Sequence, residues 1–70
     1  MHPYLIEMFW SEDDQAWLCT APDLPGCSAA GNSPVEAVRE MEDAMASWLD
    51  ACANMGRDLP QPLARPQKAA

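Results

Sequence analysis

Apolar and polar residues alternate along the first segment of the chain, residues 4–10. This pattern is typical of a β-strand, in which successive side chains point to opposite faces. The two faces hold Tyr4, Ile6, Met8 and Trp10 on one side, and Leu5, Glu7 and Phe9 on the other. Because both faces carry large apolar side chains, we expect one to pack on a helix and the other to contact a second subunit.

Two further short strands are predicted at residues 17–21 and 27–30, so the first thirty residues form an antiparallel meander. A polar loop at residues 11–15 joins the first two strands. Pro-Asp-Leu-Pro-Gly-Cys at residues 22–27 joins the second and third. Within it, proline pre-sets φ at the second position of a type II turn and glycine supplies the positive φ of the third. The residues that we expect to build this turn are Pro22, Leu24, Pro25, Gly26 and Cys27.

A long helix is predicted from Pro34, because Ser33 and Glu36 form a capping box around a proline at the first helical position. Apolar residues then recur at spacings of three and four: Val38, Met41, Met45, Trp48, Cys52 and Met55. Gly56 is suited to cap the helix end, and the prolines after it prevent its continuation. We therefore predict an α+β domain over residues 1–62, with the helix on one sheet face and a short extended segment after it. Residues 63–70 are expected to form a flexible tail.

The chain is short and acidic, with 70 residues and a formal net charge of −7. A domain of this size buries only about 60% of its unfolded surface, so a partner subunit would strengthen its thin core. Residues 1–50 hold ten acidic residues against one base, Arg39. Such a surface should repel nucleic acid and attract a basic protein. With neither a membrane-length apolar run nor an export signal in view, we expect a cytoplasmic protein.

No candidate catalytic, metal or cofactor site emerges from the titratable residues. A metal-dependent nuclease would need carboxylates that converge on ions roughly 4 Å apart. The candidates Glu7, Asp13, Asp14 and Asp23 fall mostly in separate loops. The spacing of His2, Cys19, Cys27 and Cys52 matches no recurring zinc motif. We expect reduced, buried thiols and a protein that is not an enzyme.

The combination of Asp23-Leu24-Pro25-Gly26-Cys27, Gly31 and the helix start at Glu36-Ala37 resembles the HicB antitoxin family over residues 4–62. The resemblance implies a β-β-β-α-β unit with a partial ribonuclease H-like fold. It also implies a protein that binds and occludes HicA, a small basic toxin that cleaves messenger RNA. Full-length members commonly add a DNA-binding segment, which these 70 residues do not include, so we expect no direct binding to nucleic acid.

Two surfaces are candidates for protein contacts. Glu36, Glu40 and Asp43 share one helix face, and with Asp23 they are the expected toxin-binding residues, although the face can also be merely solvated. Asp23 can alternatively brace its own turn by accepting local backbone N–H groups. Leu5, Phe9 and Trp10 are the expected contacts of a homodimer or larger oligomer. The alternative function is an orphan domain that acts through self-association or a small ligand.

Overall fold

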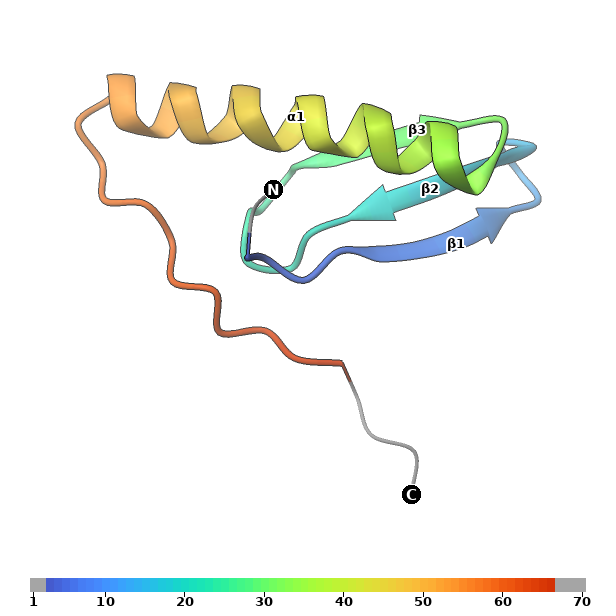
Figure 1. Ribbon diagram of the computed structural model, residues 1–70, viewed down its shortest axis with the longest axis horizontal. Helices are drawn as coiled ribbons and strands as arrows, with labels where there is room; N and C mark the ends of the chain where they lie inside the picture. The colour runs from blue at the N-terminus through green and yellow to red at the C-terminus, as the bar shows by residue number, and fades with distance from the viewer. Residues whose placement is uncertain (1–2, 67–70) are drawn as a thin grey trace.

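The computed structural model describes residues 3–66. Its elements are β1 (Glu7–Ser11), β2 (Ala16–Thr20), β3 (Ser28–Gly31) and α1 (Pro34–Asn54). The strands form one antiparallel sheet in the order β1-β2-β3, and α1 lies along one face of it (Figure 1). The predicted α+β architecture is confirmed. Residues 57–66 run on without helix or strand, so the last strand of the implied order is not formed within the described residues. His2 and the end of the predicted tail, residues 67–70, lie outside them.

The hairpin of β1 and β2 has a register in which Met8 faces Cys19 and Trp10 faces Trp17. β1 begins at Glu7, later than the alternation predicts. Continued past Glu7, the register would set Ile6 opposite Ala21 and then Leu5 opposite Pro22, which has no N–H to donate, so the ladder does not extend further. In the loop, Gln15 takes the left-handed conformation, with φ 51°.

The turn between β2 and β3 has the predicted geometry. The Cys27 N–H donates to the Leu24 carbonyl at 3.0 Å, and Gly26 has φ 81°, as the third position of a type II turn requires. A second turn precedes it, since the Leu24 N–H donates to the Ala21 carbonyl at 2.9 Å. Together these turns direct the Leu24 side chain into the core, where it is fully buried.

α1 begins and ends as its capping residues predict. The Ser33 hydroxyl accepts from the Glu36 N–H at 3.2 Å. At the other end, the Gly56 N–H donates to the Ala53 carbonyl and the Arg57 N–H to the Cys52 carbonyl. This pair of bonds is a Schellman motif, which satisfies two of the last helical carbonyls.

The core lies between α1 and the strands β2 and β3, and α1 scarcely reaches β1. Its main cluster of buried residues is Cys19, Ala21, Leu24, Cys27, Ala37, Met41 and Met45. β3 approaches the first turn of α1 closely at Gly31, where an added Cβ would lie 2.8 Å from the Ala37 Cα. The helix is therefore centred over β3 and β2, and β1 is left uncovered on its helix side.

Candidate partner-binding surfaces

Three of the four predicted toxin-binding carboxylates share an exposed face of α1. The side chains of Glu36, Glu40 and Asp43 are all exposed to solvent. They are separated by four and three residues, so they follow one side of the helix over about 10 Å. We call Glu36, Glu40 and Asp43 the acidic face.

Asp23, the fourth predicted residue, lies elsewhere and has an intramolecular partner. Its carboxylate accepts the Ala64 N–H at 3.0 and 3.3 Å. The neighbouring Pro25 carbonyl accepts from the Trp48 indole at 3.0 Å, which places this turn beside the second half of α1. Trp48 is twelve residues from Glu36, about 18 Å along the helix. Asp23 therefore does not join the acidic face, and its bond to Ala64 differs from the local turn bonds that were expected.

The segment that Asp23 holds, residues 57–66, is anchored at several points. The Tyr4 hydroxyl donates to the Pro60 carbonyl at 2.7 Å. The Cys52 thiol lies 3.5 Å from the Asp58 carbonyl oxygen and 3.9 Å from that of Arg57. Apart from the thiol contacts to Arg57 and Asp58, these bonds join residues more than 40 positions apart, so no local sequence pattern indicates them. The segment packs along the end of the sheet where the Pro-Gly turn lies.

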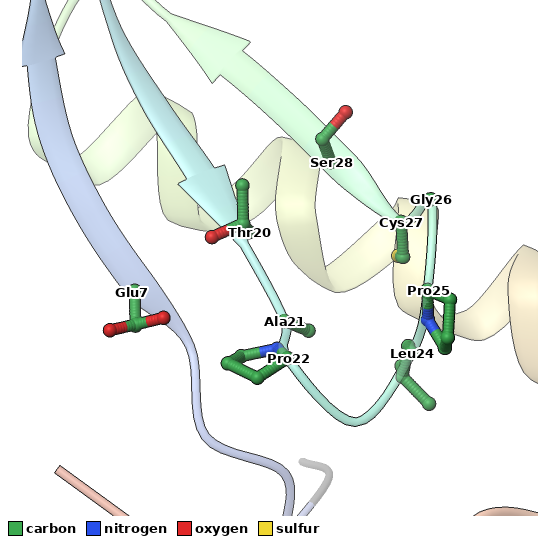
Figure 2. Close-up of a pocket in the computed structure, with 9 residues that line it drawn as sticks. All are labelled: Glu7, Thr20, Ala21, Pro22, Leu24, Pro25, Gly26, Cys27 and Ser28. Carbon is green, nitrogen blue, oxygen red and sulfur yellow. The ribbon is translucent and has the colours of Figure 1, made fainter. Parts of the chain in front are cut away.

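A shallow groove of about 430 Å³ opens at this end of the sheet, as Figure 2 shows. Glu7, Thr20 and Ser28 face one another across the three strands and form its polar row, opposite α1. The turn supplies the rest of the lining: Ala21, Pro22, Leu24, Pro25, Gly26 and Cys27. One carboxylate and two hydroxyls of this lining can exchange hydrogen bonds with a partner.

The aromatic residues predicted for a dimer contact are exposed but lie on opposite faces of β1. Phe9 is 50% exposed, pairs with Leu18 and points away from α1. Trp10 is 41% exposed on the helix side, where it meets Trp17 edge to face at 5.6 Å. Leu5 is half-buried ahead of the strand. Phe9 and Trp10 are thus neighbours along β1, but their side chains lie on opposite faces of the sheet. The three residues do not form one continuous surface.

The thiols and carboxylates considered as chemical groups lie apart. Cys19, Cys27 and Cys52 are buried and unbonded to one another, and burial raises the pKa of the Cys19 and Cys27 thiols. In residues 3–66 we find no group of three His, Cys, Asp or Glu side chains placed to hold a metal ion. Within residues 3–66, no helix is both long enough and apolar enough to span a membrane.

Comparison with known proteins supplies two matches. A family model described as the HicB-like antitoxin of bacterial toxin-antitoxin systems matches residues 2–68. A solved structure described as the HicA3 and HicB3 toxin-antitoxin complex contains a similar chain, with 32% sequence identity and a TM-score of 0.72. That match covers 90% of this chain and 71% of the other. Among curated proteins, none matches the chain.

Proposed function

Since the chain belongs to the HicB-like family of bacterial antitoxins, we propose that it binds a small basic toxin of the HicA kind and inhibits it by covering the surface that cleaves RNA. The main support is the similarity to a chain from a HicA3 and HicB3 complex at 32% identity over 90% of this chain. The protein would act in the cytoplasm, where messenger RNA is translated, and without a catalytic step of its own.

The distribution of charge supports a basic partner. Ten of the eleven acidic residues fall in residues 1–50, where Arg39 is the single Lys or Arg. Such a field attracts a cationic protein over a distance of about 8 Å at physiological salt and raises the association rate. The same field opposes binding to phosphate backbones, so the proposed role does not require contact between this chain and RNA.

The acidic face is the contact that we assign to the toxin. Its three carboxylates lie on a rigid helix capped at both ends, so they need little reordering on binding. Exposed charge pairs contribute about 0.2–1 kcal/mol each, and reversing a charge replaces that attraction with repulsion. We therefore expect the triple variant Glu36→Lys/Glu40→Lys/Asp43→Lys to weaken toxin binding by roughly ten- to a hundredfold.

The hairpin loop offers a control with the same change of net charge. Glu12→Lys/Asp13→Lys/Asp14→Lys reverses three exposed acids outside α1, in the loop between β1 and β2. Binding to a toxin of the HicA kind from the same genome is measured by calorimetry, and inhibition by protection of RNA from cleavage. Melting curves establish that both variants fold.

The two variants give distinct outcomes. A loss confined to the helix variant supports the acidic face, and equal losses would show that only net charge matters. Failure of the unaltered chain to bind or inhibit that toxin would overturn the proposed function and favour an orphan domain.

A further inference from the structure

An apolar groove of about 330 Å³ lies between β1 and the first turns of α1, on the helix side of the sheet. It is lined by Met8 from β1 and, on α1, by Pro34, Val35, Val38 and Arg39. The groove forms because α1 is centred over β3 and β2, so Val35 and Val38 remain 63% and 37% exposed. Another strand paired with β1 would lie about 4.8 Å further out in the plane of the sheet. The groove therefore does not depend on what occupies that edge.

The groove adjoins the acidic face of α1. Successive helical residues are rotated by about 100°, so residues four apart are displaced by only about 40° around the axis. Arg39 therefore falls between Val35, on the groove side, and Asp43, on the acidic face. Arg39 is exposed and is the single Lys or Arg among residues 1–50. An acidic surface thus borders an apolar recess, with one positive charge at the boundary between them.

The acidic face needs an apolar neighbour to hold a partner tightly. Exposed charge pairs steer the encounter of two proteins, but each contributes little affinity. Interfaces gain most of their affinity from a few large side chains that enter recesses closed to water, and aromatic residues are prominent among them. The groove lies where such a side chain can enter while its neighbours contact the acidic face.

We propose that the groove receives one aromatic side chain of the basic toxin, while basic residues beside that ring contact the acidic face. This inference rests on the proposed antitoxin function. The lining favours a ring over an aliphatic chain, because a methionine sulfur and an arginine guanidinium both make favourable contacts with aromatic rings. Met8 supplies the sulfur from β1, and Arg39 supplies the guanidinium from α1.

Arg39 also fixes the orientation of the toxin on this surface. Its positive charge repels a lysine or arginine of the toxin from the groove, so a neutral ring is the favoured occupant. The cations of the toxin are directed instead to Asp43 and the rest of the acidic face. Arg39 is therefore a specificity-determining residue, because it disfavours complexes in which a cation occupies the groove.

Added negative charge tests the groove against a model in which only net charge matters. Val35→Glu and Met55→Glu make the same change of charge at apolar residues that are 63% and 61% exposed. Val35 lies in the first turn of α1, and Met55 caps its far end. Both variants are more acidic than the unaltered chain, so net charge alone would tighten their binding to a basic toxin of the HicA kind.

The groove predicts opposite results for the two variants. We expect Val35→Glu to weaken toxin binding, measured by calorimetry, roughly thirtyfold, the usual effect of losing a central anchor. Met55→Glu should change it by less than about threefold. A carboxylate in the first turn of a helix interacts favourably with the helix dipole, so Val35→Glu should fold, and melting curves check this.

Arg39→Glu tests the role of the boundary charge, with Arg57→Glu as its control at an exposed position beyond the helix. Both changes again make the chain more acidic by the same amount. We expect Arg39→Glu to weaken toxin binding about tenfold, because the ring loses its cation and a cation of the toxin can now enter the groove. Arg57→Glu should leave binding unchanged or slightly tighter.

The occupant itself is identified by nuclear magnetic resonance of isotope-labelled methionine methyl groups in the full chain. An aromatic ring packed against a methyl group moves its proton resonance upfield, whereas an aliphatic side chain does not. Titration with the toxin should move the Met8 methyl resonance upfield and leave that of Met55 in place. The same movement on concentrating the chain alone would assign the groove to a second copy and overturn the proposal.

The remaining outcomes separate this inference from the function on which it rests. Failure of the unaltered chain to bind the toxin overturns both. If the unaltered chain binds, equal or tighter binding by Val35→Glu overturns the groove alone, and so does a Met8 resonance that the toxin leaves in place.

Discussion

At Gly31, β3 and α1 lie so close together that no side chain fits between them. β3 and the first turn of α1 approach each other so closely there that a Cβ would lie 2.8 Å from both the Ala37 Cα and the Glu36 carbonyl carbon. Ordinary contacts begin at 3.4 Å and the Ala37 backbone nitrogen lies closer still to the added Cβ, so the strand and the helix would have to separate by more than about 0.6 Å. All three obstructing atoms belong to the backbone, which cannot rotate away as a side chain can.

Gly31→Ala is therefore expected to destabilise the fold by about 1–3 kcal/mol, the usual cost of overpacking. The change also restricts the unfolded chain, which by itself would stabilise the protein by about 0.4–1 kcal/mol. The difference is a net loss of about 1–2 kcal/mol. For a domain of this size, that loss corresponds to a fall in Tm of roughly 4–16 °C.

The assay is thermal and urea unfolding followed by circular dichroism, with Gly26→Ala as the comparison. Nothing lies within 4 Å of a Cβ added at Gly26, so its cost comes only from its φ of 81°, about 1–2 kcal/mol. Gly31→Ser should be worse than Gly31→Ala, whereas the two changes at Gly26 should be similar. If Gly31→Ala were neutral or stabilising, the close packing of β3 against α1 would be wrong.

Three further outcomes follow from named contacts. Met41→Ala empties a fully buried site and should cost about 2–5 kcal/mol in urea unfolding, whereas Met55→Ala, at an exposed site, should change stability by less than about 0.5 kcal/mol. Burial raises the pKa of Cys19 and Cys27, so the folded state keeps protons that the unfolded chain loses above about pH 8.5. The free energy of unfolding should therefore fall as the pH rises above about 8.5. In a Cys19→Ala/Cys27→Ala variant, the free energy of unfolding should fall less over the same pH range. Asp23→Ala should speed hydrogen exchange about fivefold at the Ala64 amide, whose N–H donates to the Asp23 carboxylate, since a hydrogen bond contributes about 1 kcal/mol.

Local patterns predicted the fold because each element is specified by neighbouring residues. Ser33 and Pro34 start the helix, and Pro25 and Gly26 reverse the chain, through effects that act within one turn. The same short motifs carried the resemblance to the HicB family, which the family match over residues 2–68 confirms.

Contacts between distant segments were not predictable in this way. The bond from Ala64 to Asp23 joins residues 41 positions apart, and Asp23 resembles any other turn aspartate until that partner is known. The alternation of β1 predicted which of its residues share a face, but it could not show that α1 leaves β1 uncovered. That offset depends on the close contact at Gly31 and on how the whole helix lies across the sheet.

The proposed function is the neutralisation of a basic toxin by direct binding. The decisive experiment is RNA cleavage by a purified toxin of the HicA kind from the same genome, titrated with the full chain. We expect cleavage to stop at a fixed molar ratio, and added salt to weaken the inhibition as it screens the acidic face. Cleavage that continues undiminished in the presence of excess chain would contradict it.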